Sequence, residues 1–321
     1  MTLLQVRDLR THFLTRAGAV KAVDGVSFEL GRGEILGLVG ESGSGKSVTG
    51  FSLIGHVDPP GRVVGGSIRF DGQELVGLAP PRMRELRGRR IAMVFQDPGA
   101  TLNPVLTIGQ QMVLAVQAHR RLPERDARAL AAERLTRLGI PEAPARLDAY
   151  PHEFSGGMRQ RVAIAMALLH GPDLIIADEP TTALDVSIQA QILVEMRALA
   201  RESGTALIWI SHDLAAVAAV ADRIMVMYAG RIVEAGPVRA TLAAPRHPYT
   251  RGLLDSLPAT TEPGARLRQI PGHTPALLSL PPGCPFAPRC GYADATCMTA
   301  PPVIEQDGRM ARCHHLLEPS P

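Results

Sequence analysis

The residues with the clearest chemical potential in this chain form a glycine-rich run at positions 40–47. The run reads Gly40, Glu41, Ser42, Gly43, Ser44, Gly45, Lys46 and Ser47. This spacing fits a phosphate-binding loop, in which backbone N–H groups wrap a β-phosphate, the lysine reaches the β- and γ-oxygens and the final hydroxyl ligates magnesium. Lys21 and Lys46 are the chain's only lysines, so a lysine in the loop is modest support for this interpretation.

Two adjacent carboxylates, Asp178 and Glu179, follow a short apolar run and suit hydrolysis of a bound triphosphate. Asp178 is placed to hold magnesium through water, and Glu179 to orient or deprotonate the water that attacks the γ-phosphate. The alternative is a surface acidic pair that begins a loop at Pro180. Because a phosphate loop lies upstream, we favour the catalytic interpretation.

A second glycine turn, Ser155-Gly156-Gly157, precedes a predicted helix. Its hydroxyl and helix-terminal N–H groups suit a γ-phosphate, although an ordinary helix N-cap has the same composition. If both grips cannot reach one nucleotide within a chain, two chains can share it, each supplying its loop to one face. We therefore expect a nucleotide sandwich between two chains.

The elements that position these residues alternate between strands and helices. Strands are predicted at residues 3–10, 26–30, 35–39, 67–70, 91–95, 174–177 and 205–210, and helices at residues 46–56 and 159–169. A helical pattern over about residues 107–138 indicates an inserted helical subdomain. Functional residues follow the ends of several strands, as in an open α/β sheet whose ligand crevice lies at that edge. A hairpin at residues 224–233 and the proline-rich texture beyond it place a domain boundary near residue 236.

Composition limits the class of protein. The chain has 321 residues, 45% of them apolar, and a mean hydropathy of +0.07, so it is globular. Its formal net charge of +3 is small, which gives no reason to expect nucleic-acid binding. No secretory signal is visible, and the longest apolar stretches are less than half of the roughly 20 residues that span a bilayer. We expect a cytoplasmic protein that does not itself cross a membrane.

Together these motifs resemble the ATP-binding cassette of ABC transporters over roughly residues 1–236. The resemblance implies a P-loop NTPase fold of the α/β class, with a RecA-like core, an antiparallel β subdomain and an inserted helical subdomain at about residues 97–167. Residues 237–321 would form a small, irregular, cysteine-containing C-terminal domain. The implied cofactors are ATP and Mg²⁺, with Ser47, Gln96 and Asp178 as the magnesium ligands.

The same resemblance assigns roles to residues that are unremarkable alone. Gln96 becomes the residue that senses magnesium and contacts the membrane subunit, and His212 the histidine that acts on the γ-phosphate. Asp185, in Thr182-Ala183-Leu184-Asp185, becomes the acid of the D-loop. Phe13 is the nearest candidate for an aromatic that stacks on adenine, and it is equally suited to a core position.

Two further stretches resemble the oligopeptide, dipeptide and nickel importers, particularly their first ATPase subunit. They are Gln96-Asp97-Pro98 with Thr101-Leu102-Asn103-Pro104, and Arg246-His247-Pro248-Tyr249-Thr250. This implies an ATPase that drives uptake of short peptides from the cytoplasmic face of the bacterial inner membrane. Its implied partners are a different ATPase subunit, two integral-membrane permease subunits and an external substrate-binding protein. The alternatives are an importer of nickel or another small solute and, much less favoured, a soluble ATPase that acts on nucleic acid or ribosomes.

All four cysteines lie near the C-terminus, at Cys284, Cys290, Cys297 and Cys313. In a cytosolic chain, where disulfides are disfavoured, four clustered thiolates predict a metal centre. Their wide, uneven spacing suits an iron–sulfur cluster better than zinc, and His314 or His315 would substitute for one ligand. The resemblance to peptide-importer subunits with a Cys-Pro-Phe-x-Pro-Arg-Cys tail implies a 4Fe-4S cluster, with zinc as the second choice.

Overall fold

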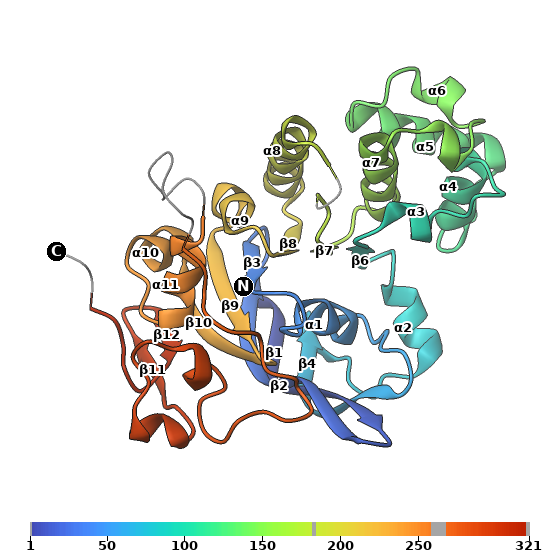
Figure 1. The fold of residues 1–321 in the computed structure, drawn as a ribbon. Coiled ribbons are helices and arrows are strands. Elements are labelled where there is room, and N and C mark those ends of the chain that lie inside the picture. Colours follow the sequence, from blue (N-terminus) through green and yellow to red (C-terminus); the bar gives the residue numbers. More distant parts are fainter. Residues whose placement is uncertain (1, 182–183, 258–267, 319–321) are drawn as a thin grey trace. The chain divides into compact units, whose positions relative to one another are not determined.

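The computed structural model describes residues 2–181, 184–257 and 268–318. Contacts within the chain define two compact units, each assembled from separate stretches of sequence. We call residues 2–29, 36–76 and 211–318 the phosphate-loop unit, and residues 30–35 and 77–210 the helical unit. Figure 1 shows the course of the chain through both.

An antiparallel sheet begins the phosphate-loop unit. It has the strand order β2-β1-β4-β5, with β1 at Thr2–Thr15, β2 at Gly18–Gly31, β4 at Gly61–Phe70 and β5 at Gln73–Glu74. Strand β1 pairs with β4 from Leu4 opposite Phe70 to Phe13 opposite Gly61. Strands β1 and β2 run well beyond the predicted segments at residues 3–10 and 26–30.

A second set of strands in this unit carries the phosphate loop. Strand β3 (Ile35–Val39) is buried at every residue and runs parallel to β9 (Arg223–Tyr228), as its continuous apolar sequence predicts. The set continues through β10 (Arg231–Pro237) and β12 (Arg309–Arg312) to β11 (Val303–Gln306), all antiparallel. The C-terminal part of the chain thus joins the sheet beside β10.

Four helices complete the described part of this unit. They are α1 (Lys46–Leu53), α9 (Leu214–Val220), α10 (Val238–Ala243) and α11 (Pro248–Asp255). A Cβ at Gly37 of β3 would lie 2.1 Å from Val217 of α9, so this glycine permits close packing of helix on strand. Helix α1 ends before the predicted residue 56, because Gly55 adopts a φ of 60°, the left-handed conformation typical after a helix C-terminus.

The helical unit contains a parallel sheet with the order β8-β7-β6. Its strands are β6 (Ile91–Val94), β7 (Leu174–Asp178) and β8 (Ala206–Ser211). The pairs Val94 with Ala177 and Ala177 with Trp209 bring the carboxyl ends of neighbouring strands side by side. The unit therefore brings Gln96 and Glu179, which follow β6 and β7, to one edge of this sheet.

Helices α3 to α7 of this unit cluster together, whereas α2 and α8 lie apart from that cluster (Figure 1). The bounds are α2 at Pro80–Leu86, α3 at Pro98–Thr101, α4 at Ile108–Gln117, α5 at Glu124–Arg137, α6 at Ala143–Arg146, α7 at Gly156–Ala167 and α8 at Val186–Ser203. The helical pattern predicted over residues 107–138 corresponds to two helices. The chain breaks into α4 and α5, with Pro123 at the N-cap of α5.

The C-terminal stretch is mostly irregular, as its prolines predict. Besides β11 and β12 it holds two short 3₁₀ turns, Ala287–Arg289 and Ala295–Met298. Throughout residues 2–181, 184–257 and 268–318, no helix has both the length and the apolar character that crossing a bilayer requires.

Candidate functional site

The glycine-rich run lies between strand β3 and helix α1, which is the strand–loop–helix context that a phosphate loop requires. Gly43 and Gly45 have φ values of 77° and 107°, which side chains other than glycine rarely adopt. At Gly45 a Cβ would also lie 2.1 Å from the carbonyl oxygen of Ala22. The glycines are therefore needed for the loop to close this tightly.

Lys46 begins α1 and is only 4% exposed. Its Nζ donates hydrogen bonds to the carbonyl oxygens of Gly40 at 2.8 Å and Glu41 at 3.0 Å, so the ammonium lies against the loop. The hydroxyl of Ser44 is fully buried and has no hydrogen-bond partner among the described residues. A buried donor of this kind fits a phosphate oxygen, which would satisfy it on binding.

Two predicted catalytic residues lie together in the helical unit. Gln96 follows β6, and its Nε2 donates to Oε2 of Glu179 at 3.2 Å. Glu179 follows β7, and its N–H donates to the carbonyl oxygen of Ile210 at 2.9 Å. Its φ of 45° is unusual for a residue other than glycine, and such strain is common at functional sites. Asp178, the last residue of β7, is 2% exposed.

His212 follows β8 and lies in the phosphate-loop unit, where its side chain is exposed. The next residue, Asp213, caps α9 by accepting from the N–H groups of Ala215 and Ala216. His212 thus stands at the junction of a strand and a capped helix. Its predicted role on the γ-phosphate stays a prediction.

The second glycine turn is an exposed helix N-terminus. Ser155 is the N-cap of α7, and its hydroxyl accepts from the N–H of Met158 at 3.3 Å. A Cβ at Gly156 would meet nothing within 4 Å, whereas one at Gly157 would lie 3.0 Å from Ile188. The turn is therefore a helix cap whose Ser155 and Gly156 are exposed.

Asp185 is the N-cap of α8. Its carboxylate accepts from Ser187 Oγ at 2.6 Å and from the N–H of Ile188 at 2.9 Å, and these bonds lower its pKa. Two other residues of the predicted D-loop, Thr182 and Ala183, lie outside the described residues. The structure thus shows Asp185 in a capping role.

Phe13 lies on β1, opposite Gly61 of β4. A Cβ at Gly61 would lie 2.6 Å from the Phe13 ring, so the ring covers that glycine's backbone. The side chain is half-buried rather than part of the core. Its stacking on adenine stays a prediction.

The four cysteines carry free thiols, and Cys284, Cys297 and Cys313 are buried. The N–H of Cys284 donates to the carbonyl oxygen of Cys297 at 2.9 Å, which joins two of the cysteine segments. Burial, together with the charges of the other three cysteines, raises the pKa of Cys313 to about 11. Four mutually repelling thiolates need a cation to be deprotonated together, so the donor set fits a metal centre.

One group of potential ligands is compact enough to meet a single ion. In the part of the chain that the structure describes, Asp294, Cys297 and His315 are the one set of three or more whose ligand atoms all lie within 4.8 Å of one another. His315 Nε2 lies 3.1 Å from Asp294 Oδ1. Among the described residues, the sulfurs of the four cysteines do not form such a compact set.

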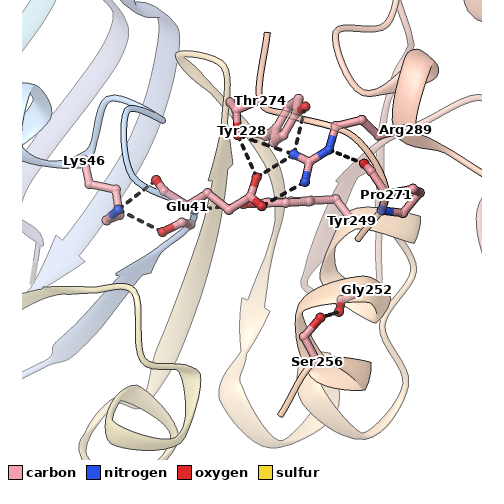
Figure 2. Close-up of polar contacts among 10 residues, drawn as sticks. Glu41, Lys46, Tyr228, Tyr249, Gly252, Ser256, Pro271, Thr274 and Arg289 are labelled. Carbon is pink, nitrogen blue, oxygen red and sulfur yellow. Dashed lines mark hydrogen bonds and ion pairs between the residues drawn. The ribbon is translucent and has the colours of Figure 1, made fainter. Parts of the chain in front are cut away.

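Sequence reasoning missed three residues that bind the phosphate loop from outside. Arg289, Thr274 and Tyr249 all form hydrogen bonds with Glu41 (Figure 2). Arg289 and Tyr249 stand in the two C-terminal motifs, Cys-Pro-Phe-x-Pro-Arg-Cys and Arg-His-Pro-Tyr-Thr. The motifs were the available signal, but nothing in the spacing shows that they reach residue 41.

The phosphate loop and the acids after β7 define a nucleotide-binding ATPase of the P-loop class. A family model described as ABC transporter matches residues 23–182, and one described as the C-terminal region of oligopeptide/dipeptide transporters matches residues 233–297. The chain belongs to the ABC transporter family as one of its ATP-binding subunits. This confirms the resemblance and the predicted ATPase activity.

Named relatives match nearly the whole chain. The oligopeptide transport ATP-binding protein OppD of Escherichia coli is 48% identical over 317 residues, which is 98% of this chain and 94% of OppD. The dipeptide transport ATP-binding protein DppD of the same organism is 45% identical over 320 residues, which is 99% of this chain and 98% of DppD.

The fold also matches a solved structure. The ATP-binding cassette MJ0796, in a dimeric post-hydrolysis state bound to ADP and Pi, has a TM-score of 0.66 and 27% identity. The match covers 74% of this chain and 99% of that one. The predicted α/β class and cassette fold are confirmed.

Proposed function

We propose that this chain is the ATP-hydrolysing subunit of an importer of short peptides. The observation that carries the proposal is the combination of a formed phosphate loop with a C-terminal region of the oligopeptide/dipeptide transporter type, shared over nearly full length with OppD and DppD. A nickel importer is the second candidate, because the same C-terminal motifs resemble those of nickel importers.

The chain's own residues would act in sequence on the nucleotide. Lys46 and the loop amides bind the β- and γ-phosphates, and Ser47, Gln96 and Asp178 stay the predicted ligands of magnesium. Magnesium, when bound, neutralises charge on the phosphates. Glu179 orients and deprotonates the attacking water, and its hydrogen bond from Gln96 fixes the direction of its carboxylate.

The assembly we propose contains two cassettes. Residues 155–157 of each would face the nucleotide held by its partner's phosphate loop, with Asp185 near the shared boundary and Phe13 against the adenine. The partner would be a different ATPase subunit, and the pair would work with two integral-membrane permeases and an external binding protein at the cytoplasmic face of the inner membrane. The division into residues 1–236 and 237–321, with a helical subdomain at about 97–167, belongs to the same proposal.

We propose that the four cysteines bind a 4Fe-4S cluster. The four thiols are free, three of them are buried, and their charges would repel one another, which supports this proposal. Anaerobically purified protein should contain about four iron and four sulfide per chain, with visible absorption. Stoichiometric zinc without iron would contradict the cluster and favour a mononuclear site.

The transport function is tested with the complex reconstituted in liposomes. Addition of ATP should drive uptake of a labelled dipeptide or oligopeptide in the presence of the binding protein. The same complex carrying Glu179→Gln should bind ATP and transport nothing, because the group that activates water is lost. Uptake of Ni²⁺ but of no peptide would favour the second candidate.

A further inference from the structure

The second residue of the phosphate loop, Glu41, is tied by its side chain to the cysteine-containing turn (Figure 2). Arg289 Nη1 lies 2.6 Å from Glu41 Oε2, and Arg289 Nη2 lies 2.9 Å from Glu41 Oε1, which makes a two-pronged ion pair. Thr274 Oγ1 donates to the same carboxylate at 3.0 Å. Paired, charge-assisted hydrogen bonds of this geometry are among the stronger polar contacts in proteins.

Arg289 is almost fully buried, with its side chain 4% exposed. Its Nε donates to the carbonyl oxygen of Pro271 at 2.9 Å, and its guanidinium lies 5.8 Å and 5.9 Å from the ring centres of Tyr228 and Phe286. A desolvated charge in this setting needs its partner. Although burial raises the pKa of Glu41, its hydrogen bonds with Arg289 lower it below the ordinary value, so the carboxylate is charged.

The backbone of Glu41 is held by hydrogen bonds at both its N–H group and its carbonyl oxygen. Its N–H donates to the hydroxyl of the buried Tyr249 at 2.8 Å, and its carbonyl oxygen accepts from Lys46 Nζ at 3.0 Å. One residue therefore links Lys46, which reaches the phosphates, to Arg289, which lies outside the loop. A shift of the Glu41 side chain would move the carbonyl that positions the Lys46 ammonium.

Hydrogen bonds within the cysteine-containing turn fix the position of Arg289. The N–H of Ala287 donates to the carbonyl oxygen of Cys284 at 3.1 Å, and that of Cys290 to Ala287 at 3.2 Å. Arg289 lies inside this 3₁₀ turn, directly before Cys290. The direction of the guanidinium is thus set by the segment that carries two of the cysteines.

We infer that Arg289 is a positioning residue for ATP binding, which holds Glu41 in the phosphate loop and neutralises a carboxylate that would otherwise repel the triphosphate. Two physical effects combine. The ion pair fixes the carbonyl that meets Lys46, and it removes an unpaired negative charge from the edge of the anion site. Neither effect depends on which solute the transporter carries.

Isothermal titration of the full-length, anaerobically purified chain with MgATP tests this inference. A Glu179→Gln background prevents hydrolysis during the measurement. Arg289→Ala should raise the Kd for MgATP roughly tenfold, as the loss of a paired charge predicts, and Arg289→Lys should recover part of that loss. Arg246→Ala is the matched control, because Arg246 pairs with Asp307 in the same unit and should leave the Kd unchanged.

The double variant Glu41→Gln with Arg289→Ala separates positioning from a merely structural role. Removal of the unpaired carboxylate should bring the Kd closer to the parent value than Arg289→Ala alone, so the two changes are not additive. A thermal melt of each variant shows that it is folded. The inference is overturned if Arg289→Ala lowers the melting temperature but binds MgATP as tightly as the parent, or if the two substitutions weaken binding additively.

Discussion

The phosphate loop and the turn at residues 155–157 are both glycine-containing helix N-termini, but they are built differently. The loop is closed from within by Lys46 and from outside by Tyr249 and Arg289. The turn has one capping bond within the helix, and its Gly156 meets nothing within 4 Å. The difference fits our proposal that the loop is organised for its ligand within one chain, whereas the turn would acquire its ligand only on assembly.

The largest expected effect comes from the loop's own cation. Lys46→Ala should reduce ATP hydrolysis by the assembled complex on the order of a thousandfold, because a preorganised charge on the phosphates is lost. Lys21→Ala, at the chain's only other lysine, is the control and should hydrolyse ATP normally. Near-normal hydrolysis by Lys46→Ala would show that the loop does not act as we describe.

Low pH should destabilise the fold around Tyr249 and His247, which hold the phosphate loop through Glu41. Burial lowers the pKa of His247 to about 4, and its Nδ1 accepts the N–H of Tyr249, the residue that anchors Glu41. In the unfolded chain this histidine has a pKa near 6.5, so it is protonated at pH values at which the folded chain keeps it neutral. Protonation therefore favours the unfolded state, and stability is lost as the pH falls from 6.5 to 4. Protonation of His247 should reduce the free energy of unfolding by on the order of 3 kcal/mol over this pH range.

Denaturant unfolding at several pH values measures that loss. His247→Asn retains a side chain that can cap helix α11 but does not titrate, so its unfolding free energy should fall less between pH 6.5 and 4. The exposed His273 provides the control substitution, His273→Asn, which should behave as the parent. An unchanged pH dependence in His247→Asn would remove this histidine from the account.

A negative charge introduced in the turn at residues 155–157 tests how this turn differs from the phosphate loop. Gly156→Asp places an acid in the first turn of α7, where it favours the helix dipole and has room for a side chain, so the single chain should stay folded. In the assembled complex the same acid would repel a γ-phosphate and lower hydrolysis on the order of tenfold. ATP affinity of the isolated chain should not change, and a comparable loss there would contradict the proposed sharing.

The smallest effect is expected from the cysteine turn. Cys290→Ser keeps the adjacent Arg289 but loosens the turn that directs it, so the Kd for MgATP should rise only about threefold, less than for Arg289→Ala. Titration calorimetry under anaerobic conditions measures this. A larger effect than that of Arg289→Ala would mean that the cysteines act on the nucleotide by another route.

Much of the loop and its setting was predictable because the signals are local. The signals are the apolar run of β3, the glycine spacing of the loop and Lys46 at the start of α1. They follow one another within about a dozen residues, so no long-range contact is needed to recognise them. The contact between Glu41 and Arg289 was not predictable, because it joins residues 248 positions apart through tertiary packing. The helical pattern over residues 107–138 predicted helices but not where α4 ends, although Pro123 marks the start of α5.

Hydrogen exchange of backbone amides tests the central claim that one nucleotide is held by two chains. In the isolated chain carrying Glu179→Gln, MgATP should protect the amides of residues 40–47 and leave those of residues 156–158 unchanged. In the assembled complex with the same substitution, MgATP should protect both segments. Protection of residues 156–158 in the isolated chain, or its absence in the nucleotide-bound complex, would contradict the account.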